Sequence, residues 1–194
     1  MIGSRTMSAS EPHPLQVEDQ VLVRRAQQDL RLFAELYQRY AQQVYRYLLV
    51  RTGNVDDAHD LTSQTFLLAM ESLHKYRGEG HFAAWLLGIA RRKSVDQYRR
   101  RKPETALETA ASLPDALEMP DDLIDRKLVL EQIGRKLQTL APERAEALAL
   151  RLFAGLEVAE IAQIMDKNEA AVRMLVFRGL RDLQAQLHAT REER

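Results

Sequence analysis

The side chains of this sequence best suited to binding an anion lie in one short segment. Between Arg91 and Lys102 the only acidic residue is Asp96. The cations of the segment are Arg91, Arg92, Lys93, Arg99, Arg100, Arg101 and Lys102. Such a run can hold the phosphates of a nucleic acid. It is equally typical of the solvated end of a helix, where cations complement the helix dipole, and charge alone does not distinguish the two interpretations.

The charges of the chain are divided unevenly between its halves. Overall, 28 Lys and Arg residues balance 28 Asp and Glu residues. Residues 1–102 nevertheless carry 16 cations and 11 acidic residues, a balance of +5. Residues 103–194 carry 12 cations and 17 acidic residues, a balance of −5. This segregation indicates a polyanionic partner for the first half.

The composition restricts the class of protein. No cysteine is present, which excludes disulfides and thiolate metal ligands and suits the reducing cytoplasm. No apolar stretch approaches the roughly 20 residues that cross a bilayer. The histidines lack metal-ligand spacing, and neither a phosphate-binding loop nor a Ser/His/Asp set is indicated. We therefore expect no metal, no cofactor and no enzymatic activity, and a disordered leader at residues 1–15.

Apolar residues recur at helical spacing throughout, which predicts an all-α protein. The first helix ends at the turn Gly53-Asn54, the second begins at Val55, and the third runs from about Phe82 to Arg100. The residues expected to point inward are Leu32, Phe33, Leu36, Tyr37, Tyr40, Val44, Tyr47, Leu48, Leu61, Thr65, Leu68, Ala69, Leu73, Phe82, Trp85, Leu86, Ile89 and Ala90.

The organisation of the chain changes at Pro103. From there to Asp125 it has seven acidic residues, three prolines and no Lys or Arg, which is typical of a linker. Helical spacing resumes near Leu123. We therefore predict two helical domains, residues 16–102 and 125–188, with an acidic linker at 103–124 and a tail at 189–194.

A helix-turn-helix pattern lies near the C-terminus. Residues 158–165 predict a short helix, three residues intervene, and a longer helix begins at Glu169. We expect Asn168 to cap the longer helix and Asp166 to adopt a left-handed conformation. The predicted core face of the longer helix consists of Val172, Val176, Leu180, Leu183 and Leu187; the opposite face consists of Ala170, Arg173, Met174, Phe177, Arg178 and Arg181. The arginines suit phosphates or guanine edges, although an ordinary helical hairpin has the same spacing.

Two blocks of this sequence resemble the extracytoplasmic-function (ECF) family of RNA polymerase sigma factors. Residues 57–67, DAHDLTSQTFL, resemble the family's region 2.2. Residues 76–91, YRGEGHFAAWLLGIAR, resemble region 2.3, and the segment to Arg101 resembles region 2.4. Residues 140–183, which begin LAPER, resemble region 4. The likeness covers about residues 28–102 and 125–187, in the family's order.

The resemblance implies a promoter-recognising subunit that binds core RNA polymerase at the clamp helices of its largest subunit and at the flap. The residues implied at the clamp helices are Asp57, Asp60, Gln64 and Phe66. Without the resemblance, Asp60 and Gln64 have the spacing of an ordinary solvated helix face, and Phe66 that of a core residue.

The resemblance also assigns a surface to the melted −10 element, in which the loop from Lys75 to His81 takes a flipped base. The residues implied there are Lys75, Arg77, His81, Trp85, Arg91, Arg92, Arg99 and Arg100. An aromatic ring beside single-stranded DNA can stack on a base. Phe82 and Trp85 nevertheless share a helix face with Leu86 and Ile89, which favours a place in the core.

The −35 duplex is assigned to the helix-turn-helix. The residues implied there are Asn168, Ala170, Arg173, Met174, Phe177, Arg178 and Arg181. Family members usually have small, polar or basic residues at positions 174 and 175, where this chain has Met and Leu. Met174 and Phe177 can contact thymine methyls but donate no hydrogen bond. We therefore expect weak or unusual −35 recognition, or a domain that serves a partner surface instead.

The resemblance implies one further partner and a role for the linker. ECF sigma factors are commonly held inactive by an anti-sigma factor between their domains, and their linker threads a positively charged polymerase channel; a merely soluble tether has the same composition. The alternative function is a stand-alone helix-turn-helix regulator that dimerises or senses a ligand. The acidic linker favours the sigma factor, because a dimeric regulator pairs its modules about a two-fold axis.

Overall fold

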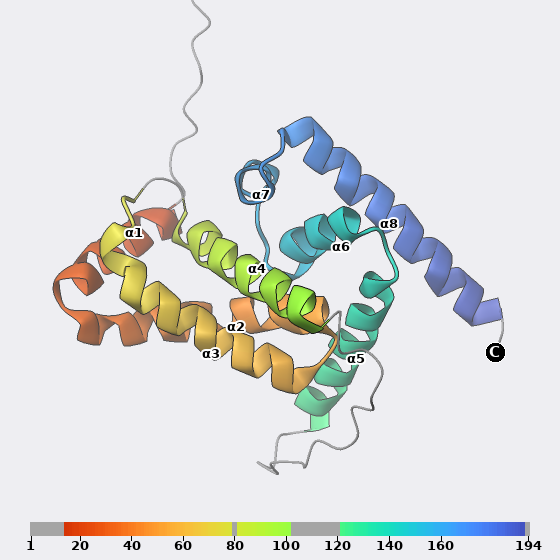
Figure 1. Ribbon diagram of the computed structural model, residues 1–194, viewed down its shortest axis with the longest axis horizontal. Coiled ribbons are helices and arrows are strands. Elements are labelled where there is room, and N and C mark those ends of the chain that lie inside the picture. Colours follow the sequence, from red (N-terminus) through yellow and green to blue (C-terminus); the bar gives the residue numbers. More distant parts are fainter. Residues whose placement is uncertain (1–13, 79–80, 102–120, 193–194) are drawn as a thin grey trace, which may run out of the picture.

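The computed structural model describes residues 14–78, 81–101 and 121–192, with side chains over 18–78, 81–100 and 129–186. Every regular element in these ranges is helical (Figure 1), so the predicted all-α fold is confirmed. Most of the predicted leader and linker, together with Lys102 and the side chains of Arg101 and Leu187, lie outside these ranges. None of the described helices is long and apolar enough to cross a membrane.

Four helices form what we call the N-terminal module, residues 14–101. They are α1 (Pro14–Gln28), α2 (Phe33–Thr52), α3 (Val55–Ser72) and α4 (Phe82–Arg101), with 3-10 turns at Leu30–Leu32 and Leu73–Lys75. α2 lies along α3, and α4 packs against both (Figure 1). α1, which the periodicity did not single out as a helix of its own, buries Leu22, Val23 and Ala26.

The turn between α2 and α3 follows from local chemistry. Gly53 has a φ of 65°, in the left-handed region that a residue without a Cβ adopts readily. Its N–H donates to the Leu49 carbonyl at 2.8 Å. The Asn54 side chain then accepts the Asp57 N–H at 3.0 Å and caps α3. The predicted turn and the helix start at Val55 are therefore confirmed.

The predicted inward stripes supply most of the N-terminal core. Leu48 and Leu86, for example, have no exposed surface. Two expected core residues are instead exposed, Tyr37 by 47% and Leu68 by 36%. Leu68 is one residue, and so about 100° of helix rotation, away from the buried Ala69. The face of α3 that is buried is thus narrower than the face that carries its apolar residues.

The C-terminal module spans residues 121–192. Its elements are α5 (Asp121–Gln138), α6 (Pro142–Leu148), a π-helical segment (Ala149–Phe153), α7 (Val158–Met165) and α8 (Glu169–Glu192). α5 begins two residues before the expected Leu123. α8 packs along α6, and a Cβ at Gly179 would lie 2.8 Å from the Leu148 side chain. The two helices therefore approach closely at a residue without a side chain.

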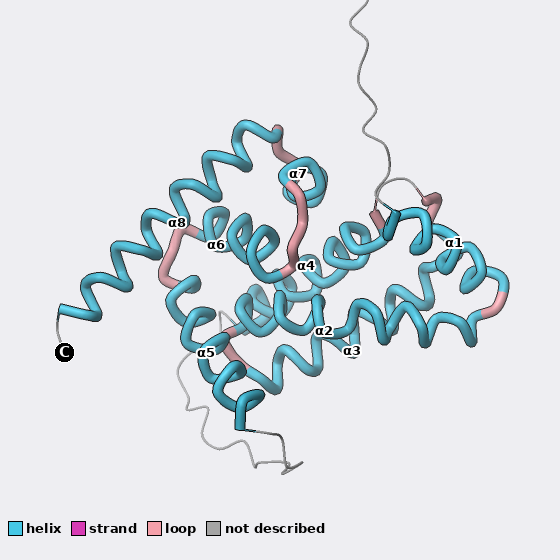
Figure 2. The backbone as a smooth tube through the Cα atoms, turned by 180° about the vertical axis from the view of Figure 1, so that it is seen from behind, coloured by secondary structure: helices cyan, strands magenta, loops and turns pink. Residues whose placement is uncertain are grey.

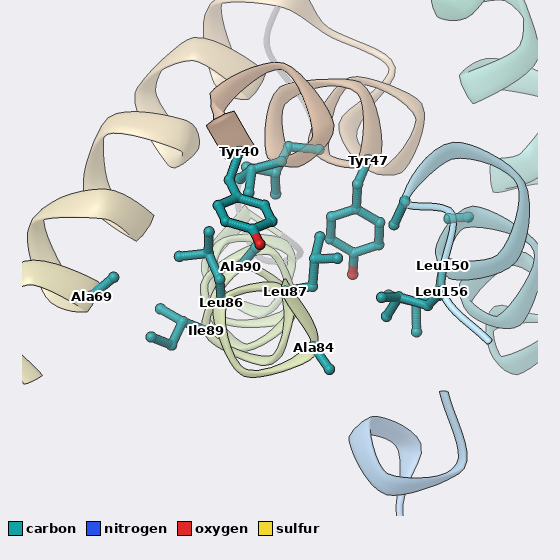
Figure 3. Close-up of a cluster of buried hydrophobic side chains, with 14 of the residues drawn as sticks. Tyr40, Tyr47, Ala69, Ala84, Leu86, Leu87, Ile89, Ala90, Leu150 and Leu156 are labelled. Atoms are coloured by element: carbon teal, nitrogen blue, oxygen red, sulfur yellow. The ribbon is translucent and has the colours of Figure 1, made fainter. Parts of the chain in front are cut away.

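The two modules pack directly against each other. α5 lies mainly against α2, the π-helical segment also contacts α2, and α7 contacts α4 (Figures 1 and 2). Tyr47 and Leu87 of the N-terminal module share one buried cluster with Leu150 of the C-terminal module (Figure 3). At the crossing of α2 and α5, a Cβ at Gly134 would lie 3.1 Å from the Val50 backbone. The hydrophobic core is therefore continuous across the junction.

Leu86→Ala should lower the free energy of unfolding by about 2–5 kcal/mol, because it removes buried atoms and leaves a cavity. Urea denaturation followed by circular dichroism measures the loss. Leu67→Ala makes the same change at a side chain that is 56% exposed, and its effect should stay within about 0.5 kcal/mol. Equal losses for the two variants would contradict the assigned core.

Candidate nucleic-acid interface

Three of the cations assigned to −10 DNA form an exposed row on α4. Arg92, Arg99 and Arg100 are all exposed. Positions 92 and 99 are seven residues apart and lie on nearly the same side of the helix. Among the side chains that the structure places, Arg91 is the α4 cation that enters an ion pair. The row therefore presents positive charge to the solvent, as phosphate binding requires.

In the loop before α4, some side chains face the solvent and one contacts the C-terminal module. Lys75 and Arg77 are exposed, and Gly78 has a φ of 76°. At the end of the loop, the His81 Nδ1 atom lies 2.7 Å from Glu160 Oε1 on α7. His81 is therefore turned toward the other module, whereas Lys75 and Arg77 remain available to an external ligand.

An aromatic cluster underlies this loop. The Trp85 ring centroid lies 5.2 Å from that of Tyr76 and 5.4 Å from that of Phe82. Phe82 is 3% exposed, so its predicted core placement is confirmed. Trp85 is only partly buried, so its predicted core placement is met in part.

The residues assigned to polymerase docking lie at two depths on α3. Asp60 and Gln64 are one turn apart on the outer side, and the Gln64 amide donates to the Asp60 carboxylate at 2.7 Å. Phe66 is buried beneath this surface, with its ring centroid 4.7 Å from that of Tyr37. Asp57 is also buried. Of these four residues, Asp60 and Gln64 therefore have polar groups on the outer side of α3, whereas Asp57 and Phe66 are buried.

The helix-turn-helix is present with the predicted boundaries. α7 ends at Met165, and Asp166 has the predicted left-handed conformation, with a φ of 53°. Asn168 caps α8, because its side-chain oxygen accepts the Ala171 N–H at 2.8 Å. The start of α7 has a second cap, in which the Glu157 N–H donates to the Glu160 carboxylate at 2.8 Å.

The predicted outward face of α8 is exposed along its described length. The exposed residues are Ala170, Arg173, Met174, Phe177, Arg178 and Arg181. Arg173 pairs with Glu169 one turn earlier at 2.6 Å. Met174 and Phe177 are 47% and 58% exposed. Of the predicted core face, Val172 is fully buried, and Val176, Leu180 and Leu183 are partly buried. The surface therefore combines arginines with two large apolar side chains.

One predicted DNA-binding residue, Arg91, belongs to a buried charged cluster that sequence reasoning did not find. Glu146 of α6 is 4% exposed. Its carboxylate accepts the Tyr47 hydroxyl at 2.6 Å, lies 3.1 Å from Arg51 Nη2 and lies 3.8 Å from Arg91 Nε. Burial, together with the neighbouring Glu146 charge, raises the pKa of Tyr47 well above its usual value. The phenol therefore stays a hydrogen-bond donor.

The sequence contains a signal for this cluster but not for its partners. Glu146 is the only acidic residue between Glu143 and Glu157, and apolar residues surround it from Ala145 to Leu150. A carboxylate on such a face indicates a buried partner. Which cation meets it follows from the packing of the two modules and from no local pattern.

Comparison with known proteins identifies both modules. Models of sigma-70 region 2 and sigma-70 region 4 match residues 36–104 and 130–183. The chain is 36% identical over 167 residues to the ECF RNA polymerase sigma factor BldN of Streptomyces coelicolor, an alignment that covers 84% of this chain and 63% of BldN. It is 32% identical over 174 residues to the ECF RNA polymerase sigma-E factor of Haemophilus influenzae, and this alignment covers 84% of this chain and 92% of the sigma-E factor.

The fold has a counterpart among solved structures. The co-crystal structure of the sigma factor RpoE with the anti-sigma factor NepR from Bartonella quintana matches with a TM-score of 0.64 at 20% identity, over 80% of this chain and 96% of that chain. A region 2 module followed by a region 4 module defines the sigma-70 class of transcription initiation factors. Within that class, the chain belongs to the ECF RNA polymerase sigma factors.

Asn168→Ala should destabilise the protein by about 0.5–2 kcal/mol, because the first turn of α8 loses the acceptor for a free N–H. Urea denaturation measures the change. Asn168→Asp keeps an oxygen in the same place and should remain close to the wild-type stability. A loss as large in the Asp variant would show that the side chain acts by something other than capping.

Proposed function

We propose that this chain directs core RNA polymerase to promoters, with the N-terminal module binding the core enzyme and the melted −10 element and the C-terminal module binding the −35 duplex. The observation that carries the proposal is the pair of exposed cationic faces, one on α4 and one on α8, on modules that match regions 2 and 4. The role consists of binding without catalysis, and it is exercised in the cytoplasm, where the polymerase works.

In vitro transcription with core enzyme, followed by sequencing of the start sites, tests the whole proposal. The expected result is initiation at a defined set of promoters, together with co-elution of chain and core enzyme. Tight and specific binding of the lone chain to a palindromic duplex, without polymerase, would instead support a stand-alone regulator.

Polymerase docking is proposed for the outer side of α3, around Asp60 and Gln64. Exposed apolar side chains continue this surface, with Leu67 56% and Tyr37 47% exposed. Apolar surface rimmed by polar groups is typical of a protein–protein interface. The chemistry of the surface thus agrees with the role that the family resemblance implies.

Asp60→Arg combined with Gln64→Arg should abolish co-elution with core polymerase, because the change reverses the charge at the proposed interface. The helical circular dichroism should be unchanged, since both side chains lie on the outer side of α3. The control is Glu18→Arg with Gln42→Arg, which adds the same charge at exposed positions outside α3 and should leave co-elution intact. Retained transcription by the first variant would exclude this docking surface.

The α4 row of Arg92, Arg99 and Arg100 is proposed to hold phosphates beside the −10 element. Lys75 and Arg77 extend this positive surface, and the partly exposed Trp85 provides a ring on which a base can stack. Each phosphate contact releases counterions, so the affinity of the complex falls with increasing salt concentration.

Neutralising two of these cations, Arg99→Gln with Arg100→Gln, should weaken promoter complexes and flatten the plot of log affinity against log salt concentration. The expected change is roughly 0.7–0.9 units of slope per lost contact, measured by filter binding of the polymerase holoenzyme. Arg24→Gln with Arg25→Gln removes the same charge from exposed positions of α1 and should keep the wild-type slope. An unchanged slope in the α4 variant would remove the row from the interface.

For the −35 duplex, the exposed face of α8 supports a mixed mode of contact. Arg173, Arg178 and Arg181 suit phosphates and guanine edges, whereas Met174 and Phe177 suit thymine methyls. The face has two large apolar side chains and few neutral hydrogen-bond donors. It therefore favours apolar contact with thymine methyls over recognition of base edges by hydrogen bonds. The acidic linker is proposed to lie in a positively charged channel of the polymerase.

Control by an anti-sigma factor is also proposed. The similar RpoE chain was crystallised with its anti-sigma factor NepR. Two modules that meet over a partly charged junction can be held or separated by such a partner. Co-purification of the chain from its host, followed by mass spectrometry, would identify the inhibitor.

A further inference from the structure

A glutamine near the end of α1 holds the start of the loop before α4. The side-chain amide of Gln27 donates to the Leu73 carbonyl at 2.9 Å and to the Tyr76 carbonyl at 2.8 Å. Leu73 begins the 3-10 turn after α3, and Tyr76 follows that turn. Carbonyl groups at the end of a helix lack partners from the helix itself, and the glutamine amide has two N–H groups with which to meet two of them. Gln27 thus ties α1 to this loop.

A second side chain of α1, Asp19, contacts the aromatic residues beneath the same loop. Its carboxylate accepts the Tyr40 hydroxyl and pairs with Arg39. The Tyr40 ring centroid lies 5.4 Å from that of Phe82, the first residue of α4. Burial raises the pKa of both Tyr40 and Tyr76, and Asp19 raises it further. Both phenols therefore stay hydrogen-bond donors.

The two contacts of α1 lead to the two rings that support Trp85. The Trp85 ring centroid lies 5.2 Å from that of Tyr76 and 5.4 Å from that of Phe82. Tyr76 is only 7% exposed, and its backbone carbonyl is one of the two that Gln27 holds. A base stacks on an aromatic side chain only where the face of the ring is presented to it. A shift of the Tyr76 backbone would therefore change the indole that the base meets.

The contacts of Gln27 differ from those of an ordinary surface glutamine. The residue is exposed, but its partners lie 46 and 49 residues away in the chain. Asp19, Val23 and Gln27 recur every four residues and so lie along one side of α1. Val23 is 2% exposed. The side of α1 that carries Gln27 is therefore the side packed on the N-terminal module, where α1 reaches both α2 and α4 (Figure 1).

We infer that Gln27 is a positioning residue for recognition of the melted −10 element, because it holds the Tyr76 backbone and so fixes the ring on which Trp85 rests. This inference rests on the proposed function, since it uses the stacking role of Trp85. It goes further by giving α1 a part in DNA recognition, although α1 supplies no side chain to either proposed DNA surface. Gln27 acts through Tyr76 and without contacting DNA.

Substitutions at position 27 separate hydrogen bonding from the length of the side chain. Gln27→Met keeps a long side chain but removes both donors, because a thioether is only a weak acceptor. Gln27→Lys keeps donors, because an ammonium group has three N–H groups. The matched controls are Gln28→Met and Gln28→Lys, the same changes at the next residue, which is also exposed. Because both positions are at the surface, all four variants should keep the wild-type circular dichroism.

Trp85 reports on its own surroundings, because it is the only tryptophan of the chain. Acrylamide quenching of its emission in the free full-length chain measures the exposure of the indole without DNA or polymerase. Gln27→Met should raise the Stern–Volmer constant and shift the emission to longer wavelength, because Tyr76 no longer covers the indole in one fixed place. Gln27→Lys and both Gln28 variants should keep the wild-type values. Unchanged quenching in Gln27→Met would overturn the inference.

The effect on DNA is measured with polymerase holoenzyme formed by each full-length variant. The probe is a fork-junction duplex whose single-stranded end carries the −10 element of a promoter mapped by start-site sequencing. Gln27→Met should bind about three- to tenfold more weakly, the range that the loss of one net hydrogen bond gives. The plot of log affinity against log salt concentration should keep its slope, because no phosphate contact is lost. A flatter slope, or wild-type affinity despite raised quenching, would also overturn the inference.

The inference and the proposed function can fail separately. Trp85→Leu keeps an apolar side chain in the aromatic cluster but removes the ring, so it should weaken the same complex whatever the role of Gln27. Raised quenching in Gln27→Met, together with wild-type affinity in Trp85→Leu, would show that the proposed stacking role fails. Weaker binding by Trp85→Leu, together with unchanged quenching in Gln27→Met, would overturn the inference alone. Combining Gln27→Met with Trp85→Leu should add little to the loss, because both changes act on one ring; fully additive losses would contradict this route.

Discussion

A carboxylate removed from water is tolerated only where donors meet its charge, and the junction of this protein is arranged around one such group. Glu146 lies in an otherwise apolar stretch of α6, and its donors come from α2 and α4 of the other module. α2 therefore packs against its own bundle along one side and supplies Tyr47 and Arg51 to the junction from another. The position of the helix-turn-helix relative to the N-terminal module follows from this contact and from the apolar cluster around it.

Much of the fold could be predicted because its signals are local. The left-handed Asp166, the capping Asn168 and the Gly53-Asn54 turn each act within a few residues, so the ends of their helices are readable from the sequence. The inward stripes were predicted for the same reason. The predicted burial of Leu68 was wrong, because apolar character does not distinguish a core position from one at the edge of an exposed face. Helical periodicity identifies the apolar face of a helix, but a residue on that face is buried only where another element packs over it.

The candidate surfaces were predictable in part. Arg92, Arg99 and Arg100 are exposed, as a run of cations with Asp96 as its one acidic residue indicates. Arg91 could not be separated from that run, nor His81 from the exposed residues of its loop, because the acidic residues that contact them are distant in the chain. The uneven charge of the two halves therefore has a second interpretation besides an external partner. A basic first half and an acidic second half attract each other as well as external partners, so the segregation describes an internal contact together with a binding surface.

The glycine at position 179 has a consequence for how promoters are discriminated. It lies two residues beyond Phe177 on α8, at the point where this helix meets Leu148 and the Arg144 carbonyl of α6. A methyl group there would push the two helices apart and tilt α8 on its support. In the proposed complex with the −35 duplex, the angle of α8 to the DNA is therefore set by its contact with α6. Related chains with identical groove-facing residues but a bulkier residue at this position would align differently with the bases, and so prefer different sequences.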